Sequence, residues 1–470
     1  MEPFTLTAGE VAAATAGELV QGNARQAIGT VSIDSRRIAA GDFFIAIRGE
    51  RFDGHRFVAD ALRSGASGAM VDAVPEGASV GSETSAPVVI KVGDTTAGLQ
   101  DLARDVRRRS GSRVVAITGS AGKTTTKEVT AEFLSARYRV FRNKGNLNNH
   151  IGLPLSLLEL RQKPDVAVVE LGMNHPGEIR TLVGIAEPDV RVWTNVGDAH
   201  LGFFASPDAI ADAKGEVLDG AKPGDVLVAN ANDPRVMSRA RAFKGRLVTF
   251  GLDVVADVQA TGIEVLGLEG TVAHVRTPAG AARVQTPLPG LGNLANVLAA
   301  TAVALELGVP LSDVVERARG LRPAARRGEI LRLPGGVTVV DDSYNSSPSA
   351  LTRALETMGA SSGSARKAAV LGEMLELGAH SERLHVECGR AAAAAGLDWL
   401  VTVGGAPARA LAEAAVAAGM RPAAVTHVAT REDAAAAALE RVRPGDLILV
   451  KGSRGIGTDV VVDRLKVEFD

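Results

Sequence analysis

A chain of 470 residues should form two to four domains, since single hydrophobic cores stop growing at about 250–300 residues. Its 46% hydrophobic and 23% charged residues are typical of a globular protein, and its net charge of −2 gives no overall field to hold nucleic acid or an anionic membrane. The single cysteine, Cys388, excludes internal disulfides, and the lack of a signal-peptide pattern or a spanning apolar run predicts a cytoplasmic protein without membrane insertion.

Residues 1–108 are predicted to form a small N-terminal α/β domain. Thr7 and Glu10 stand at the spacing of a capping box before an alanine-rich run, which indicates a first helix. A further helix is expected over residues 94–109. We interpret its last residues, Arg107-Arg108-Arg109, as a solvated helix end that marks the domain boundary.

Two polar segments of this domain are candidate binding elements. Asp34-Ser35-Arg36 is either a plain turn with a surface arginine or a hydrogen-bonding cluster for a nucleotide or sugar. The loop 49–55, which contains Gly54 and His55, is polar and precedes a predicted helix. The residues alone leave both interpretations of the first segment open.

The segment from Val114 to Glu128 combines a buried strand, a glycine turn and the start of a helix. The turn is Gly119-Ser120-Ala121-Gly122, and Lys123-Thr124-Thr125 follows it. Such an arrangement directs backbone N–H groups at an anion, with the lysine near phosphates and the first threonine placed to bind Mg²⁺. The consensus phosphate-binding loop has four residues between its glycines rather than two, so an ordinary strand–helix turn is the alternative. The order Gly-Lys-Thr-Thr in this context favours the phosphate-binding loop.

The central domain, residues 109–322, alternates strands with helices, which predicts a doubly wound parallel sheet with ligands at the carboxyl ends of its strands. A period-two pattern over residues 258–286 predicts added antiparallel strands. Glu170 ends an apolar strand and is either a Mg²⁺ ligand or a capping or salt-bridge residue. His200 follows the next strand, and a structural role and a ligand role are equally open for it.

Three further polar residues of the central domain lie on predicted helices. Lys214 is on an amphipathic helix and would ordinarily be solvated. Asn293 and Asn296 stand three apart and share a helix face, where they are either helix-start caps or contacts to a base.

Residues 323–470 are predicted to form a third α/β unit. Strands are expected near 337–341, 368–371, 400–403, 424–428 and 447–450. Polar segments follow the first, second and last of these strands, and the first of them ends at Pro348, a residue suited to begin a helix. Because all three segments leave strand carboxyl ends, they should line one cleft.

The chain resembles the Mur ligases, the ATP-dependent amino-acid ligases of peptidoglycan synthesis, over essentially its whole length. The resemblance is carried by TGSAGKTT at 118–125, by NKGNLNN at 143–149 and by Glu-Leu-Gly at 170–172. It implies a small N-terminal α/β domain for the UDP-linked substrate, a central ATP-binding domain and a Rossmann-like C-terminal acceptor domain. It also implies ATP and two Mg²⁺ ions, one of them on His200, and a carbamylated lysine at Lys214.

Within the family the chain is most similar to the ligases that add D-alanyl-D-alanine to UDP-N-acetylmuramoyl-tripeptide through an acyl phosphate. This closer similarity rests on segments 34–37, 52–57, 341–348, 372–378 and 450–454. The catalytic and metal-binding residues implied are Lys123, Thr124, Glu170, His200 and Lys214. The implied ATP contacts are Gly119, Ser120, Ala121, Gly122, Lys123, Thr124, Thr125, Asn293, Asn296, Arg327, Asp342 and Tyr344. The implied substrate contacts are Asp34, Ser35, Arg36, Gly54, His55, Asn146, Asn149, Asn345, Pro348, Lys451, Ser453 and Arg454.

Two departures from the family pattern bear on nucleotide affinity. The family's Gly-Arg-His-Asn is here Gly290-Leu291-Gly292-Asn293, which removes an arginine and a histidine from adenine binding, and its Gly-Arg-x-Glu leaves Arg327 as the matching arginine. The alternatives are another Mur or folylpolyglutamate-type ligase that adds a single amino acid, a P-loop kinase, or a non-catalytic nucleotide-binding scaffold. We expect a monomer with no nucleic-acid partner.

Overall fold

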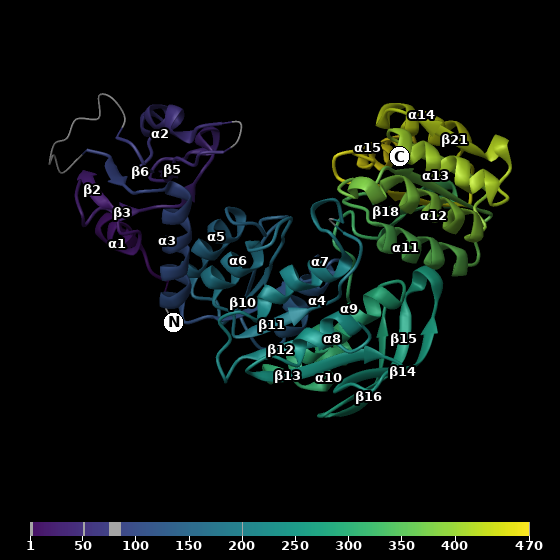
Figure 1. The fold of residues 1–470 in the computed structure, drawn as a ribbon, viewed down its shortest axis with the longest axis horizontal. Helices are drawn as coiled ribbons and strands as arrows, with labels where there is room; N and C mark the ends of the chain where they lie inside the picture. The colour runs from purple at the N-terminus through teal and green to yellow at the C-terminus, as the bar shows by residue number, and fades with distance from the viewer. Residues whose placement is uncertain (1–2, 50–51, 75–85, 200, 470) are drawn as a thin grey trace. The chain divides into compact units, whose positions relative to one another are not determined.

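The computed structural model describes residues 3–49, 52–74, 86–199 and 201–469 (Figure 1). The chain divides into two compact units, and each is built from separated segments. The first comprises Met1–Ala116, Tyr138–Met173 and Gly177–Val190, and the second comprises Ile117–Arg137, Asn174–Pro176 and Arg191–Asp470. Strands alternate with helices along the chain, so the predicted α/β class is confirmed.

The N-terminal part of the first unit contains a five-stranded sheet in the order β2-β7-β6-β5-β4. All neighbours pair in parallel except β2 and β7. Helix α2 (Val58–Arg63) packs on one face, where Phe44, Val58 and Ala61 share a buried cluster. The strands are β2 (Glu18–Gln21), β4 (Val31–Ser32), β5 (Phe43–Ile45), β6 (Gly68–Val71) and β7 (Val88–Lys91). A separate antiparallel pair, β1 (Leu6–Thr7) and β3 (Ala27–Ile28), flanks α1 (Ala8–Ala14).

The capping box predicted before α1 is confirmed. Thr7 Oγ1 accepts the Glu10 N–H, and Glu10 Oε2 accepts the Thr7 N–H. This reciprocal pair satisfies two backbone donors at the start of the helix.

The three arginines that end α3 (Thr95–Ser110) do not form a uniformly solvated helix end, as the sequence suggested. Arg107 is buried, and its guanidinium donates to the carbonyls of Ala186, Ser112 and Glu187 and to the Asp189 carboxylate. The buried charge is stable there because each of the three guanidinium nitrogens donates to at least one oxygen. Arg107 therefore fastens the end of α3 to the segment that follows α6 (Glu178–Ala186).

The largest sheet has nine strands in the order β16-β15-β14-β13-β12-β11-β8-β10-β9. Its pairs from β12 to β14 are parallel, whereas β14, β15 and β16 pair antiparallel, so the antiparallel addition predicted over 258–286 is confirmed. The strands are β8 (Arg113–Thr118), β9 (Val140–Arg142), β10 (Val166–Glu170), β11 (Val190–Trp193), β12 (Val226–Asn230), β13 (Arg246–Leu252), β14 (Val258–Val265), β15 (Thr271–Thr277) and β16 (Gly280–Thr286). The other helices of this region are α4 (Lys123–Leu134), α5 (Gly152–Leu157), α7 (Pro207–Gly215), α8 (Pro234–Ala240), α9 (Leu291–Glu306) and α10 (Leu311–Ala318).

The C-terminal part of the second unit contains a six-stranded sheet in the order β17-β18-β22-β19-β20-β21. The five predicted strands are present, and β17 (Glu329–Arg332), which no sequence pattern suggested, adds an antiparallel edge beside β18. The other strands are β18 (Thr338–Asp342), β19 (Arg366–Gly372), β20 (Trp399–Val403), β21 (Val425–Val428) and β22 (Asp446–Lys451).

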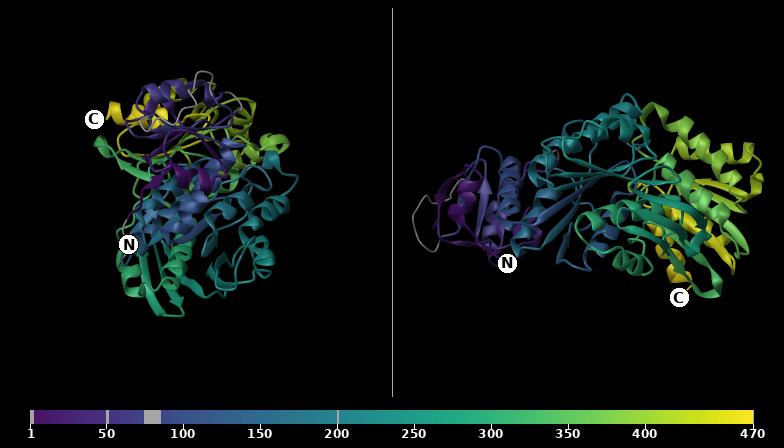
Figure 2. Two further views of the ribbon diagram at one scale, coloured as in Figure 1. Left: turned by 90° about the vertical axis from the view of Figure 1, so that its left-hand side faces the viewer. Right: turned by 90° about the horizontal axis from the view of Figure 1, so that it is seen from below.

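Helices cover both faces of this sheet. Side chains of α14 (Arg431–Arg441) and α15 (Asp459–Glu468) share a buried cluster with the strands. Helices α11 (Pro348–Ala360), α12 (Ser381–Ala394) and α13 (Ala406–Ala417) lie on the opposite face, as the green and yellow ribbons of Figures 1 and 2 show. The arrangement is the doubly wound α/β layer expected for residues 323–470.

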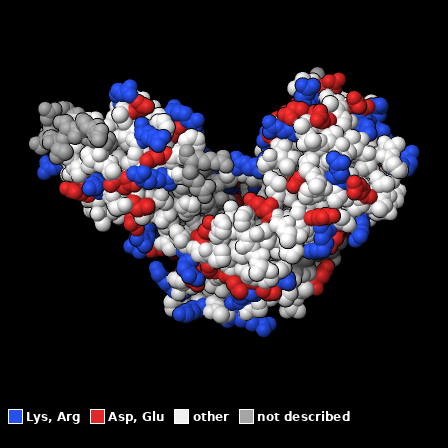
Figure 3. All heavy atoms as spheres, turned by 45° about the horizontal axis from the view of Figure 1, so that its top comes forward, with Lys and Arg blue, Asp and Glu red and all other residues white. Residues whose placement is uncertain are grey.

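Charged side chains of both signs are interspersed over the described residues on the face drawn in Figure 3. This distribution agrees with the net charge of −2. No helix among the described residues combines the length and the apolar character needed to traverse a bilayer.

Candidate functional site

The turn between β8 and α4 adopts the backbone geometry of a phosphate-binding loop. Gly122 caps α4 with φ +82°, a left-handed conformation that only glycine adopts without a steric penalty. A Cβ on Gly119 would stand 1.9 Å from Thr194 Oγ1, so this position also excludes a side chain. Strand, turn and helix N-terminus therefore stand in the order that the sequence predicted, and the N-terminal N–H groups of α4 face outward from the turn.

A polar segment after β11 holds this turn in place. The Asn195 side chain accepts the Ala121 N–H at 2.9 Å and donates to the Ala121 carbonyl at 3.0 Å, and Thr194 Oγ1 donates to the same carbonyl at 2.7 Å. Ser120 Oγ accepts the Gly197 N–H at 2.8 Å. Sequence reasoning missed Thr194 and Asn195, although polar residues directly after a buried strand were the signal that identified Glu170.

The side chain of Lys123 lies over the turn that it follows. Its Nζ donates to the Gly119 carbonyl at 2.8 Å, which curls the ammonium back over the loop. Thr124 and Thr125 occupy the first turn of α4. A cation at the mouth of a ring of backbone donors is suited to polyanionic phosphate.

Asn293 and Asn296 lie in the first turns of α9 and bond to each other rather than capping the helix, whose N-cap is Gly290. Asn296 is buried, and its Oδ1 accepts the Thr126 hydroxyl at 3.2 Å. A Cβ on Gly122 would stand 2.3 Å from the same oxygen. Asn296 is thus packed directly behind the phosphate-binding turn.

Glu170, in the first unit, is a buried carboxylate at the end of β10. Its Oε1 accepts from Asn148 Nδ2 at 2.9 Å, and its own N–H donates to Asn143 Oδ1 at 3.1 Å. Asn149 accepts the N–H groups of Ile151 and Gly152, and the Asn146 carbonyl accepts the Asn148 N–H. The segment 143–149 therefore orients Glu170, a role that its motif had not suggested for Asn143 or Asn148.

Oxygen ligands for Mg²⁺ are present, but they are few. Across residues 3–49, 52–74, 86–199 and 201–469, no group of three or more His, Cys, Asp or Glu side chains is arranged to hold a metal ion. Mg²⁺ in phosphoryl-transfer sites commonly takes one or two protein oxygens and completes its shell with phosphate and water, so the Glu170 carboxylate in the first unit and the Thr124 hydroxyl in the second are each a suitable type of ligand. His200 lies outside the described residues.

Lys214 is not the solvated residue that its helical pattern predicted. It lies on α7 and is 1% exposed. A lysine is rarely buried to this extent unless its amine has an electrostatic partner or a chemical modification. The burial of Lys214 is therefore set by the residues packed around it and not by the amphipathic pattern of its helix.

In the N-terminal part, Asp34 and Arg36 form a bidentate pair on the short 3₁₀ helix Ser35–Arg37. Arg36 Nε and Nη2 each stand 2.8 Å from a carboxylate oxygen of Asp34, and the Arg36 side chain is 86% exposed. The hydrogen bonds from Arg36 lower the pKa of Asp34 to about 2. Asp34 also accepts the Arg36 N–H, so this carboxylate aims an exposed guanidinium.

His55 and Gly54 have close structural partners. His55 Nε2 accepts the Asp72 N–H at 3.0 Å, and Nδ1 stands 2.7 Å from Asp53 Oδ1, so both ring nitrogens are engaged. A Cβ on Gly54 would stand 2.8 Å from the backbone of Ile47. These contacts give His55 and Gly54 a structural role in fixing the shape of the loop.

In the C-terminal part, the ends of β18 and β22 are joined by charge. Asp342 and Lys451 are direct partners in the sheet register, and Lys451 Nζ donates to Asp342 Oδ2 at 2.5 Å and to the Asn345 carbonyl at 3.0 Å. Pro348 begins α11 three residues later, as predicted. The predicted convergence of the segments after these strands is thus realised at this pair.

Tyr344 lies between two guanidinium groups. Arg327 Cζ is 3.9 Å and Arg454 Cζ is 5.6 Å from the centre of its ring. Cations over an aromatic face are attracted by its quadrupole. Tyr344 thus brings together Arg327, at the start of the C-terminal part, and Arg454, just after β22.

The loop 372–378 is fixed from beneath by buried groups. Ser453 is buried, and its hydroxyl accepts the Leu375 N–H at 2.9 Å. His385 Nε2 accepts the Met374 N–H at 2.9 Å, and its Nδ1 donates to the Ser381 carbonyl at 2.7 Å. Burial lowers the pKa of His385. Ser453 and His385 therefore position this loop, and His385 was not anticipated from the sequence.

Three family models match the chain. They are the Mur ligase family catalytic domain over residues 27–107, the Mur ligase middle domain over 117–304 and the Mur ligase glutamate ligase domain over 326–454. The UDP-N-acetylmuramoyl-tripeptide--D-alanyl-D-alanine ligase of Bacillus subtilis is 34% identical over 93% of this chain and 92% of its own length.

Solved structures resemble the chain over nearly its whole length. A crystal structure of MurF from Acinetobacter baumannii has a TM-score of 0.89 at 32% identity and covers 99% of this chain and 100% of its own. The MurF ligase of Thermotoga maritima in complex with ADP has a TM-score of 0.81 at 29% identity and covers 93% of this chain and 97% of its own.

Proposed function

The chain belongs to the Mur ligase family, and we propose that it joins D-alanyl-D-alanine to UDP-N-acetylmuramoyl-tripeptide at the expense of ATP. The products are the UDP-muramoyl-pentapeptide, ADP and phosphate. The observation that carries the proposal is the phosphate-binding turn, in which Lys123 curls over Gly119 and the segment 194–197 braces the loop. The substrates are inferred from the activity named for the relatives that match nearly the whole chain.

ATP is proposed to bind at this turn, with its phosphates against the N–H groups of α4 and Lys123. Thr124 and Glu170 are the oxygen donors proposed for the first Mg²⁺, which neutralises phosphate charge when it is bound. Arg327, Asp342 and Tyr344 are proposed nucleotide contacts, together with Asn293 and the turn residues 119–125. Since Asn296 packs behind Gly122, its proposed contribution to ATP binding is to hold that turn.

Lys214 is proposed to carry a carbamate that, with His200, serves a second Mg²⁺. Its burial supports the idea, because an unmodified ammonium among metal cations would be repelled, whereas a carbamate adds a negative charge. Formation of the carbamate needs the neutral amine, so the surroundings of Lys214 must allow deprotonation at some stage.

The two substrates are proposed to bind at opposite parts of the chain. The exposed Arg36 and the segments with Asp34, Ser35, Gly54 and His55 belong to the donor nucleotide, aided by Asn146 and Asn149. Asn345, Pro348, Lys451, Ser453 and Arg454 belong to the acceptor side. The boundaries 1–108, 109–322 and 323–470, the monomeric state and the cytoplasmic location remain predictions.

The chemistry proceeds in two displacements. A carboxylate oxygen of the tripeptide attacks the γ-phosphorus, the bond to the β-phosphate oxygen breaks, and ADP leaves. The amine nitrogen of the dipeptide then attacks the acyl carbon, the bond to the phosphate oxygen breaks, and the nitrogen loses a proton as the amide forms. Lys123 and the backbone donors stabilise charge in the first step by positioning, which supplies most of the catalysis in phosphoryl transfer.

Phosphate release measured with UDP-muramoyl-tripeptide tests the proposal. We expect turnover with D-Ala-D-Ala and little with D-Ala, L-Lys or D-Glu as the acceptor. Faster turnover with a single amino acid would identify another Mur or folylpolyglutamate-type activity, and ATP binding without turnover with any acceptor would identify a scaffold. Mass spectrometry of the product separates ligation from simple ATP hydrolysis.

A further inference from the structure

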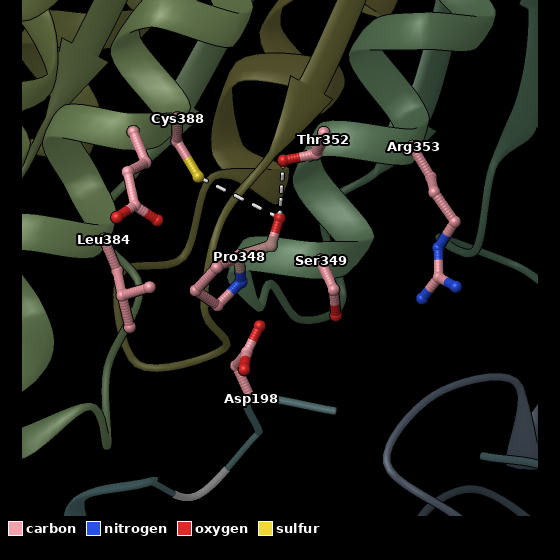
Figure 4. A pocket seen from close by; sticks show the side chains of 8 residues that line it. Asp198, Pro348, Ser349, Thr352, Arg353, Leu384 and Cys388 are labelled. Atoms are coloured by element: carbon pink, nitrogen blue, oxygen red, sulfur yellow. Dashed lines mark hydrogen bonds between the residues drawn. The ribbon is translucent and has the colours of Figure 1, made fainter. Parts of the chain in front are cut away.

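A hollow of about 290 Å³ opens beside the N-terminal end of α11. Its lining comes from α11, from α12 and from the segment after β11, and comprises Asp198, Pro348, Ser349, Thr352, Arg353, Leu384, Glu387 and Cys388. Figure 4 shows Asp198 pointing toward Pro348 from below, while Ser349 and Arg353 point down from α11. Volumes of this size suit a small ligand rather than a nucleotide-linked peptide.

Two side chains of opposite charge line the hollow without satisfying each other. Within the described residues, the Asp198 carboxylate and the Arg353 guanidinium form no direct hydrogen bond or salt bridge, although Asp198 and Glu356 both attract the charge of Arg353. Glu387 is paired with Arg383 at 2.6 Å. Two opposite charges that attract without direct contact leave room for a ligand that carries both charges.

The floor between these charges is small and weakly polar. Thr352 Oγ1 donates to the Pro348 carbonyl at 3.0 Å, and Cys388 Sγ stands 3.9 Å from the same oxygen (Figure 4). Burial raises the pKa of Cys388 to about 12, and the nearby carboxylates of Glu387 and Asp198 act in the same direction. The thiol is therefore neutral, and with Leu384 it forms a surface suited to methyl-sized groups.

The hollow adjoins the phosphate-binding turn. A Cβ on Gly197 would stand 3.3 Å from Ser349 Oγ and 3.6 Å from Ser120 Cβ, so Gly197 is in van der Waals range of both. Asp198 follows Gly197 directly. A ligand held by Asp198 would thus have one end next to Ser120, where the acyl phosphate is expected to form.

We propose that this hollow is the acceptor pocket, in which Asp198 binds the ammonium group of the dipeptide and Arg353 binds its terminal carboxylate. This assignment rests on the proposed function and specifies the residues that read the two ends of the acceptor. A dipeptide zwitterion matches the two separated charges, and its two methyl groups match the floor formed by Leu384, Thr352 and Cys388. Discrimination against the monomeric amino acid follows, because its two charges are closer together than those of a dipeptide.

Gly292, at the start of α9, lies close to Arg353. A Cβ on Gly292 would stand 3.8 Å from Arg353 Cδ, which is an ordinary van der Waals distance.

Ligand chemistry and mutation together test the two ends of the pocket. D-Ala-D-Ala and its C-terminal amide are compared as acceptors with the wild-type enzyme and with Arg353→Gln, with saturating ATP and UDP-muramoyl-tripeptide. The wild type should show a KM at least about tenfold higher for the amide, because the charge-assisted bond is lost. Arg353→Gln should treat the acid and the amide alike. Asp198→Asn should raise the KM for the dipeptide by about tenfold or more and leave the KM for ATP unchanged.

Arg390→Gln on the exposed side of α12 and Glu413→Gln on α13 are matched controls that remove the same charges elsewhere and should leave the kinetics unaltered. Unchanged dipeptide KM values in both pocket variants, or a wild type that already accepts the amide equally well, would overturn the pocket assignment while ligation continued. A rise in the KM for ATP alone would make the hollow a nucleotide site. If the wild type fails to ligate any dipeptide, the proposed function itself fails, which is a different outcome.

Discussion

The amide of Gly202 donates a 2.7 Å hydrogen bond to the carbonyl of Glu376, which joins the segment after β11 to the loop after β19. The contact is tight, since a Cβ on Gly202 would stand 2.9 Å from that oxygen and 2.9 Å from the Gly378 nitrogen. Glu376 adopts φ +66°, a conformation that a non-glycine residue holds only when its surroundings enforce it. This is a contact between two backbones. It joins the connection after β11, whose first residues hold the phosphate-binding turn, to the loop held by Ser453 and His385.

Gly202→Ala should disrupt this contact and uncouple ATP consumption from ligation. The methyl group forces the two segments apart, and misplacement by about 1 Å can cost about a hundredfold in rate. We expect phosphate release to exceed pentapeptide formation, because an acyl phosphate exposed to water hydrolyses. Gly224→Ala, at a glycine with nothing within 4 Å of the added Cβ, is the control. A ratio of one phosphate to one product in Gly202→Ala would show that the contact does not protect the intermediate.

Lys123→Ala should abolish ligation, a loss of at least about a thousandfold, because its ammonium serves the phosphates rather than the core. Steady-state phosphate release measures the loss, and thermal melting should be close to that of the wild type. Lys244→Ala, at an exposed lysine, is the matched control. Normal turnover by a folded Lys123→Ala protein would remove the phosphate-binding turn from the mechanism.

Arg36→Ala should raise the KM for the UDP-linked donor by about tenfold and leave the KM for ATP unchanged. The guanidinium is exposed and is aimed by Asp34, so its loss removes a ligand contact without disturbing packing. Initial rates at varied donor and ATP concentrations measure both constants. Arg63→Ala, which removes another exposed guanidinium from this part of the chain, should change neither. Equal effects on the two substrates would indicate a folding defect.

Lys214→Ala should be nearly inactive, and short carboxylic acids should restore part of the activity by supplying the anion that a carbamate provides. The buried position explains why a soluble acid would substitute for it, since the truncated side chain leaves a space of that shape. Lys222→Ala removes an exposed lysine and should have wild-type activity. Lys214→Glu keeps the negative charge at a shorter reach and tests whether charge alone suffices. Wild-type turnover by Lys214→Ala would end the carbamate proposal.

His385 should make the protein less stable in acid. Burial lowers its pKa from 6.5 in the folded state, so below about pH 6.5 the unfolded chain binds a proton that the folded chain does not. This contribution to stability is complete above pH 6.5 and is lost as the pH falls, by at most about 1.4 kcal/mol per pH unit. Chemical denaturation between pH 5 and 7.5 should show a shallower pH dependence in His385→Gln than in the wild type. His274→Gln, at an exposed histidine, should retain the wild-type slope.

Features set by neighbouring residues in sequence were predictable. The capping box of Thr7 and Glu10, the glycine turn before α4 and the helix start at Pro348 each depend on a few adjacent residues, and all three predictions are confirmed. The resemblance to the Mur ligases is confirmed as well. Its motifs are contiguous and therefore visible in one sequence.

Features set by distant partners were not predictable. Asn195 bonds Ala121 across 74 positions, and Arg107 bonds the Ala186 carbonyl across 79, so no local period reports either pair. Arg107 was predicted to be solvated, and this prediction is wrong, while the helical pattern around Lys214 would ordinarily indicate a solvated lysine, yet Lys214 is buried as well. A charged side chain can be buried only where hydrogen-bond acceptors surround it. These acceptors come from residues distant in sequence, so a local pattern does not reveal them.

The place of β22 in its sheet has a consequence for biosynthesis. It is the last strand of the described chain, yet it lies between β18 and β19, and its Lys451 closes onto Asp342. The five-stranded N-terminal sheet is complete once residue 91 has emerged from the ribosome. In the C-terminal sheet, β18 can pair with β17 and β19 with β20 earlier, but each lacks its other neighbour until residues 446–451 have been made. On the nascent chain, the C-terminal strands would therefore have unpaired edges for most of their synthesis, a state that invites aggregation and chaperone binding.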